Sequence, residues 1–379
     1  MDGNPQKYIW QHDNWPRFQW HSGELLTLLG KVRHAQGGLS ATAKALGFEL
    51  SHQAQAEILV EEAVKTSAIE GEALNRDSVR SSVARRLGLP QAGAAPAERH
   101  VDGLVEILLD ATRNHHEPLT AQRLKGWQAA LFPTGYSGIR KIRVGDWRDG
   151  PIVVVSGPEG RQKVHFEAPP GEVVAEEMKR FLQWWKKSLG REEGVLRAGV
   201  AHLWFVTVHP FEDGNGRIAR AITDMALAQD EQQPLRLYSF SSQIMEERDD
   251  YYAVLEQTQK GTLDITAWLT WFLGCLLRSM DRSEAMIHKV LTKARFWQRH
   301  SQTTLNDQQK KIVNRLLDAG EGEFHGGLTT RKYVAIAKTS RSTAIREIND
   351  LVEKQVLVRG SQSKGRSVWY DLNWEELSG

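Results

Sequence analysis

The chain has little cysteine and no long apolar run. Its one cysteine, Cys275, cannot form an internal disulfide, and the apolar run 268–277 around it predicts a buried, inert thiol in a reducing compartment. Thr270 and Gly274 interrupt this run, which is too short to span a bilayer. The first residues hold neither a basic nor an apolar export segment. These absences predict a cytoplasmic protein without membrane contact.

An excess of charge of one sign is also lacking. The 49 Lys and Arg residues stand against 47 Asp and Glu residues, which gives a net charge of +2. Any contact with nucleic acid must therefore come from a local patch. With 40% hydrophobic and 25% charged residues, the 379-residue chain has the composition of a soluble protein with two or three domains.

The chemistry concentrates in residues 209–220, His-Pro-Phe-Glu-Asp-Gly-Asn-Gly-Arg-Ile-Ala-Arg. Two glycines around an asparagine let the backbone N–H groups form an anion-binding concavity, which a helix N-terminus would extend. Arg217 and Arg220, three residues apart on a helix, can reach successive phosphates. Asp213 is placed to bind Mg²⁺ beside substrate phosphates, and His209 is suited to act as a general base.

These twelve residues match every fixed position of the Fic-domain signature, His-Pro-Phe-x-Asp/Glu-Gly-Asn-Gly-Arg-x-x-Arg. The resemblance implies an adenylyltransferase that moves AMP from ATP, with Mg²⁺, to a Ser, Thr or Tyr hydroxyl of a protein, itself included. His209 would be the catalytic base. Transfer of another nucleotide such as UMP stays open. The nucleotide-binding residues of the signature would be Asp213, Gly214, Asn215, Gly216, Arg217 and Arg220.

A helical pattern from Ser51 to Leu74 contains a second motif. Gly71 is typical of a helix C-cap, which places Glu70 in the last turn, where the helix dipole does not favour a carboxylate. Thr66, Glu70 and Gly71 resemble the inhibitory motif Ser/Thr-x-x-x-Glu-Gly/Asn of the Fic class whose inhibitory helix precedes the catalytic domain. The resemblance implies that Glu70 pairs with Arg220 and excludes the γ-phosphate, and it leaves open a role of Glu70 in removing AMP. The alternative is a surface glutamate.

Between residues 135 and 170 the sequence pattern changes from that of helices to that of β-strands. Residues 151–156 and 163–166 predict a hairpin around a turn at 157–160. In Fic proteins such a hairpin borders the active site and pairs with an extended segment of the target. Matching the family's Pro-Pro pair to 169–170 would place four residues beside the nucleotide: Val164, His165, Phe166 and Glu167. The alternative is a hairpin with no such role.

A segment near residue 250 resembles the part of Fic domains that packs against adenine. Tyr251 and Tyr252 would supply aromatic faces for the base, although paired tyrosines on a helix often belong to the core. Gln259 stands where the family often has Asn, which implies an amide contact with the nucleotide. His202 is interpreted as a core residue rather than a catalyst.

The last part of the chain has its own pattern. Residues 329–337 and 340–351 predict two helices, and 356–359 with 367–370 predict a hairpin around Lys364-Gly365. This order resembles a winged helix-turn-helix. Residues 331–366 hold nine basic and three acidic side chains, so DNA or a protein surface could bind through 329–370.

The predicted fold class is mainly α, a Fic helical core with a β-hairpin flap and a small α+β winged-helix domain. The expected domains are a Trp-rich segment at 1–50, a helical region with the inhibitory motif at 51–100, the catalytic domain at 101–290 and the winged helix at 300–379. The aromatic residues of 8–48 are interpreted as core, and the alternative is a surface that docks a partner. The alternative function is a DNA-binding regulator whose Fic domain senses a nucleotide, and the oligomeric state stays open between monomer and homodimer.

Overall fold

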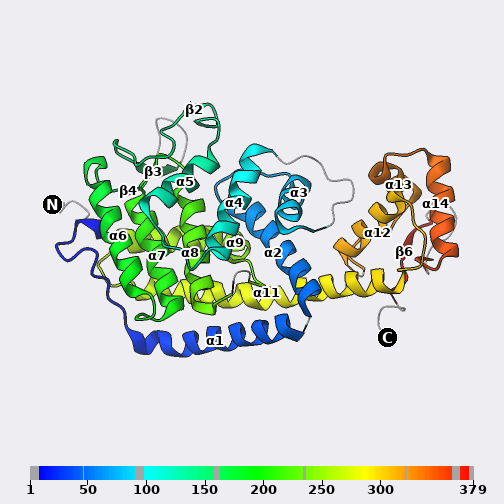
Figure 1. Cartoon of the computed structure of the whole chain (residues 1–379), viewed down its shortest axis with the longest axis horizontal. Coiled ribbons are helices and arrows are strands. Elements are labelled where there is room, and N and C mark those ends of the chain that lie inside the picture. Colours follow the sequence, from blue (N-terminus) through cyan, green and yellow to red (C-terminus); the bar gives the residue numbers. More distant parts are fainter. Residues whose placement is uncertain are drawn as a thin grey trace. The chain divides into compact units, whose positions relative to one another are not determined.

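A computed structural model describes residues 8–45, 47–89, 98–156, 163–233, 236–320, 322–360 and 368–374. The chain divides into two compact units, Met1–Ser283 and Glu284–Gly379. Figure 1 shows the first unit in blue to yellow and the second in yellow to red. Among the described residues, no helix combines the length and apolar character needed to cross a membrane.

The first unit is built around two helices, α7 (Gly194–Val208) and α8 (Asn215–Glu231), which pack against each other and are buried along almost their whole length. Buried Leu, Val and Phe side chains each contribute about 1.5–3 kcal/mol to such a core. The other helices of this unit are α1 (Ser22–Ala45), α2 (Gly47–Ile69), α3 (Arg76–Leu87), α4 (Arg99–Arg113), α5 (Ala121–Leu131), α6 (Val174–Ser188), α9 (Phe240–Glu246), α10 (Arg248–Gln259) and α11 (Thr266–Arg299), which continues into the second unit.

Gly71 ends α2, as its helix-capping character predicted. The helix stops at Ile69, before the end of the helical pattern at Leu74, because Gly71 adopts a left-handed φ of 84°. The N–H of Gly71 donates to Ala68 O (3.0 Å), and the N–H of Glu72 donates to Ser67 O (3.0 Å). These bonds satisfy the last carbonyls of α2 and turn the chain after Glu70.

Helix α1 was not predicted from the sequence. It contains four glycines, each of which costs a helix about 1 kcal/mol relative to alanine. Tertiary contacts outweigh that cost, since Arg33 forms ion pairs with Asp230 and Glu193 and Gln36 donates to Glu231 (2.8 Å). Of the aromatic residues that precede α1, Trp15 is buried and packs edge-on against Trp204, while Tyr8, Trp10, Phe18 and Trp20 are half-buried.

Two short hairpins lie between α5 and α6. The strands β1 (Tyr136–Ser137) and β2 (Arg140–Lys141) form a turn that was not predicted. The strands β3 (Val153–Ser156) and β4 (Lys163–Glu167) form the predicted antiparallel hairpin, with Val155 opposite Val164. The predicted turn at 157–160 lies outside the described residues.

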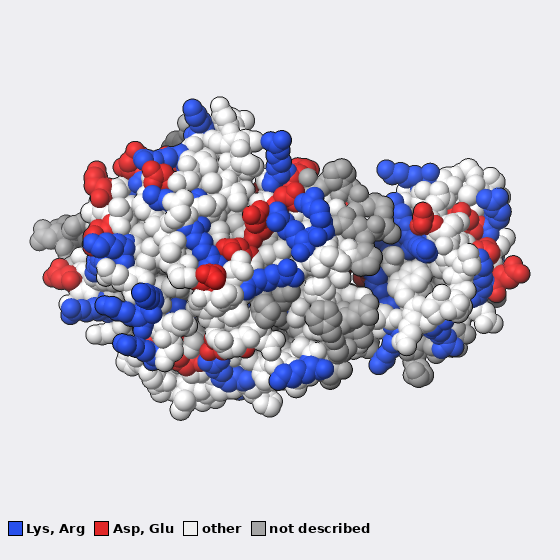
Figure 2. All heavy atoms as spheres, in the orientation of Figure 1, with Lys and Arg blue, Asp and Glu red and all other residues white. Residues whose placement is uncertain are grey.

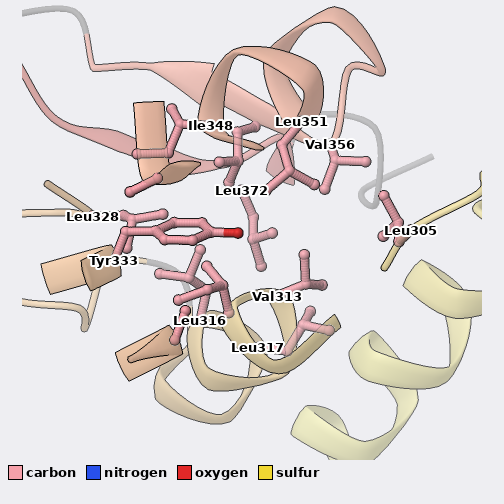
Figure 3. Packing of buried hydrophobic residues seen from close by; sticks show 14 of the residues in the cluster. Leu305, Val313, Leu316, Leu317, Leu328, Tyr333, Ile348, Leu351, Val356 and Leu372 are labelled. Atoms are coloured by element: carbon pink, nitrogen blue, oxygen red, sulfur yellow. The ribbon is translucent and has the colours of Figure 1, made fainter. Parts of the chain in front are cut away.

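The second unit has its own hydrophobic core, shown in Figure 3, where Leu316, Tyr333, Leu351 and Leu372 converge. Its elements beyond α11 are α12 (Asp307–Ala319), α13 (Thr330–Ala337), α14 (Arg341–Glu353), β5 (Leu357–Arg359) and β6 (Tyr370–Leu372). The second strand begins three residues later than predicted, because pairing of Leu357 with Leu372 places both side chains in the core. Lys364-Gly365 lies outside the described residues.

The surface charge agrees with the balanced composition. Figure 2 shows Lys and Arg side chains interspersed with Asp and Glu over the visible face of the first unit.

Candidate active site

The turn between α7 and α8 holds the signature residues. Helix α7 ends at Val208 and is capped by His209, which adopts a left-handed φ of 51°, and α8 begins after Gly214, whose φ is 87°. The Asn215 side chain accepts a hydrogen bond from Phe211 N (2.9 Å) and donates one to Phe211 O (2.8 Å). Because this amide closes the turn, the backbone N–H groups of the first turn of α8 are left to bind an anion.

His209 is oriented for proton transfer. Its Nδ1–H donates to Val206 O (3.2 Å), so in the neutral ring the Nε2 atom carries the lone pair. Burial lowers the pKa of His209, and the Arg148 charge lowers it further, while Glu70 and Asp213 raise it. The imidazole is therefore the neutral, proton-accepting form at neutral pH.

Asp213 presents one carboxylate at the mouth of the turn. Its Oδ1 accepts from Gly214 N (2.6 Å), its Oδ2 accepts from the Ser137 hydroxyl, and its side chain is 37% exposed. Within the described part of the chain, no group of three or more His, Cys, Asp or Glu side chains could hold a metal ion. A lone carboxylate fits Mg²⁺, which takes most of its ligands from water and substrate phosphates.

The two arginines of the signature are fixed at one face of α8. Arg220, with a side chain only 1% exposed, donates through Nε to Thr66 Oγ1 (2.6 Å) and through Nη2 to Thr66 O (2.9 Å). Two buried nitrogens, Nη1 of Arg220 and Nε of Arg217, have no hydrogen-bond partner among the residues that the structure describes. Buried donors without partners are costly, so these atoms indicate a place for an anionic ligand.

The end of α2 brings two carboxylates to these arginines. Glu70 Oε1 accepts from Arg220 Nη2 (2.7 Å), and Glu72 Oε2 accepts from Arg217 Nη1 (2.8 Å). A Cβ atom added to Gly216 would overlap the Glu70 carboxylate, so that carboxylate lies directly on the N-terminal turn of α8. Glu70 thus occupies the place where α8 is best able to bind an anion.

A cleft of about 570 Å³ opens beside this pair of ion pairs. Its walls include Glu70, Glu72, Phe132, Asp213 and Arg217. An anionic ligand in the cleft would therefore contact Arg217, Asp213 and the carboxylates of Glu70 and Glu72.

Comparison with known families identifies this region. The model of the Fic/DOC family matches residues 118–227, which include the turn and both arginines. The chain contains a Fic domain. Residues 8–89 match the model of a domain of unknown function, DUF4172.

Relatives of the Fic domain carry an activity in their names. Protein adenylyltransferase fic-1 of Caenorhabditis elegans is 34% identical over 93 residues, or 24% of this chain and 17% of the relative. Protein adenylyltransferase Fic of Nematostella vectensis is 29% identical over 117 residues, or 30% of this chain and 25% of the relative. The match thus spans at most a quarter of the length of either relative.

A solved structure shares the fold. The crystal structure of a Fic family protein from Desulfovibrio desulfuricans superimposes with a TM-score of 0.52 at 18% identity, over 92% of this chain and 95% of that chain.

The predicted flap residues of the Fic domain make contacts away from the signature turn. His165 Nδ1 bonds Glu256 of α10 (2.6 Å), and the buried Phe166 packs edge-on against Tyr8 at 5.2 Å. Glu167 O accepts from Trp10 Nε1 (2.8 Å), while Val164 is 42% exposed. Strand β4 is therefore anchored on α10 and on the N-terminal segment.

The predicted adenine-binding residues of the Fic domain separate into core and surface. Tyr251 is 2% exposed and its hydroxyl bonds His202 Nε2 (2.9 Å), so its ring offers no open face to a base. Gln259 is also buried and donates to Thr207 (3.3 Å). Tyr252 is 37% exposed, so a stacking role can fall only to this member of the pair. His202 has the core position that was predicted for it.

Three residues of the site were missed by the sequence analysis. Glu72 directly follows the inhibitory motif, and its acidic character was the only signal. Ser137 lies 76 residues before Asp213, and nothing in its surroundings points to that contact. Arg148, which contacts the carbonyl of His209 (2.6 Å), stands in a segment without a recognisable motif.

Proposed function

We propose that this chain is a protein adenylyltransferase that transfers AMP from ATP to a Ser, Thr or Tyr hydroxyl of a protein, itself included. The observation that carries the proposal is the group formed by His209, Asp213 and two arginines with unpartnered buried donors around the N-terminus of α8. The names of the partial relatives support the same activity.

The geometry suggests how these residues would act. His209 Nε2 would take the proton of the target hydroxyl, whose oxygen attacks the α-phosphorus while pyrophosphate leaves. Arg217, Arg220 and the free N–H groups of α8 would stabilise the negative charge that develops on the phosphates. Asp213 would hold Mg²⁺, which supplies further neutralisation of that charge. A positioned base contributes about 10²–10⁴-fold, so orientation of the two substrates must supply the rest.

We further propose that α2 keeps the site switched off, as in the Fic class with an N-terminal inhibitory helix. The Glu70 carboxylate lies where a phosphate would bind Arg220 and Gly216, and the Glu72 carboxylate neutralises Arg217. Both must move before a triphosphate can use both guanidinium groups. Once displaced, Glu70 would be near enough to orient water for the reverse removal of AMP.

Label transfer tests the activity. Protein incubated with α-³²P-ATP and Mg²⁺ should label itself or proteins of a lysate, weakly as wild type and strongly as Glu70→Ala. His209→Ala in that background should abolish labelling, whereas His116→Ala, which changes an exposed histidine outside the site, should not. Label from α-³²P-UTP in place of ATP would assign the chain to UMP transfer. Labelling that persists without His209 would contradict the proposal.

The second candidate is DNA binding by the second unit, which we propose is a winged helix-turn-helix. Helix α14 exposes Arg341, Ile345 and Arg346, with Ile345 44% exposed, and Figure 2 shows basic side chains over this unit. If DNA binds there, Arg341→Glu with Arg346→Glu should weaken a salt-dependent gel shift and reduce its salt slope. Lys311→Glu on α12 is the matched control, and equal loss in both would exclude α14 as the interface.

A further inference from the structure

Arg148 lies between the two hairpins of the first unit and reaches the end of α7. Its side chain is 2% exposed. Nε donates to His209 O (2.6 Å), Nη2 donates to Val208 O (3.1 Å), and the backbone N–H of Arg148 donates to Pro210 O (2.9 Å). Three consecutive carbonyls around the catalytic candidate are therefore bound by one residue.

The same guanidinium holds both ends of the β3–β4 hairpin. Nη1 donates to Gly150 O (2.7 Å), just before β3, and Nη2 donates to Pro169 O (2.6 Å), just after β4. At the same place Ala168 N donates to Ile152 O (3.1 Å). The signature turn and the base of the hairpin thus share one buried cation.

The chemistry of this contact requires arginine. Every hydrogen-bond acceptor of the Arg148 side chain within the described ranges is a backbone carbonyl, and two of them stand at the negative C-terminal end of α7. Burial lowers the pKa of Arg148 to about 10, which leaves it charged at neutral pH. A planar fork of donors can reach four carbonyls in different directions, which an ammonium group on a single stem cannot.

We propose that Arg148 is a positioning residue for the proposed transfer: it fixes the left-handed backbone of His209 and joins the signature turn to the hairpin as one rigid part. It would touch neither nucleotide nor target. The inference rests on the proposed function only for its effect on the rate. Displacing a catalytic group by 1 Å costs about hundredfold in rate, so loss of this clamp should appear in kcat.

Arg197 offers a matched control. It is equally buried, at 2% exposure, and donates to Ser188 Oγ, Gln229 Oε1 and Trp185 O, each at 2.9 Å, away from the signature turn. Burial lowers the pKa of Arg197 to about 10 as well. Arg197→Met therefore measures what the loss of a buried guanidinium does to the fold alone.

The kinetic test uses the full chain with Glu70→Ala, at a temperature where every variant is folded by circular dichroism. We expect Arg148→Met to lower kcat about hundredfold with little change in KM for ATP, and Arg148→Lys to restore only part of it. Arg197→Met should lower the melting temperature and leave kcat within a few-fold. Equal loss of kcat in Arg148→Met and Arg197→Met would overturn the inference.

An NMR titration of the His209 ring, assigned by its absence in His209→Ala, is independent of transfer. The groups that face this ring are Val206 O, Arg148, Glu70 and Asp213, and of these Arg148 lowers the pKa. The titration of His209 should therefore move to higher pH in Arg148→Met and stay in place in Arg197→Met. If no variant transfers AMP and this shift is still seen, the proposed reaction fails while the positioning role stands. An unmoved titration would overturn the positioning role.

Discussion

Two segments meet at the N-terminus of α8, and they are held in different ways. The signature turn, residues 209–215, is fixed by buried hydrogen bonds between uncharged groups and by the carbonyl contacts of Arg148. The end of α2 is held to the same place by the two hydrogen bonds that Arg220 donates to Thr66 and by ion pairs of Glu70 and Glu72, whose side chains are 32% and 39% exposed.

Under the proposed inhibition, the signature turn must stay in place during the reaction and the end of α2 must move away. Loss of a buried hydrogen-bond partner costs about 1–3 kcal/mol, whereas the carboxylates of Glu70 and Glu72 are partly in water and can exchange with another anion. An incoming phosphate can replace the exposed carboxylates of α2, because it offers the same charge to the same arginines. A phosphate cannot replace the hydrogen bonds that the Asn215 side chain makes with the backbone of Phe211.

The largest effect should come from the turn itself. Asp213→Ala should reduce AMP transfer to background, because the phosphates would lose the proposed Mg²⁺, while the arginines would keep most of the affinity for ATP. Labelling and calorimetric ATP titration would measure the two properties. Glu212→Ala, one position earlier, is the control and should retain activity. Unchanged turnover in Asp213→Ala would mean that the cation is held elsewhere.

Asn215→Ala should damage the turn through its fold. It leaves Phe211 N and Phe211 O without their partner in a buried place, so the free energy of unfolding in urea should fall by about 1–3 kcal/mol. Transfer should fall by about hundredfold as the turn loosens. Asn349→Ala, at an exposed position of α14, should change neither quantity. Unaltered stability in Asn215→Ala would contradict the claim that buried hydrogen bonds fix the signature turn.

The signature turn was the part most open to prediction from sequence. Its glycines, asparagine and arginines lie within twelve residues, so local geometry decides most of the site. The Glu70–Arg220 pair was also expected, because a motif of six residues marks the end of α2. By contrast, the Tyr251 ring is buried against His202, 49 residues away, and only tertiary packing decides which face of α10 turns inward. Contacts of Ser137 and Arg148 are equally remote in sequence, and α1 forms despite its glycines.

Releasing α2 should activate the protein. Glu70→Ala and Glu70→Gly should each raise transfer about tenfold or more, which corresponds to about 1.4 kcal/mol of relieved exclusion. Arg220→Ala in the same background should lower transfer again. Differential scanning calorimetry should show a larger stabilisation by ATP in Glu70→Ala than in wild type. If both variants fold yet transfer no more AMP, the resemblance of Thr66 to Gly71 is accidental.

The second carboxylate should have a smaller effect. Glu72→Gln should raise transfer about two- to threefold, because its ion pair with Arg217 is more exposed than that of Glu70. The double variant with Glu70→Ala would show by labelling whether the two ion pairs act independently. A decrease in transfer would assign Glu72 to nucleotide binding instead.

The smallest predicted change is in pH dependence. The Glu70 carboxylate raises the pKa of His209, so Glu70→Ala should lower that pKa. A base with a lower pKa stays neutral further into acid, and the acid limb of kcat/KM should move to lower pH. Arg148→Met should move it the other way. A limb that moves upward in Glu70→Ala would show that another group limits the rate.

The missing side chain of Gly216 has a consequence for cellular control. The space that a Cβ would fill holds one carboxylate, and the same space cannot hold a phosphate as well. The proposed inhibition by α2 would then compete with ATP, so it would weaken as the ATP concentration rises. The protein would respond to the ATP concentration of its surroundings without a separate sensor, and any partner that draws α2 away would lower the ATP concentration needed.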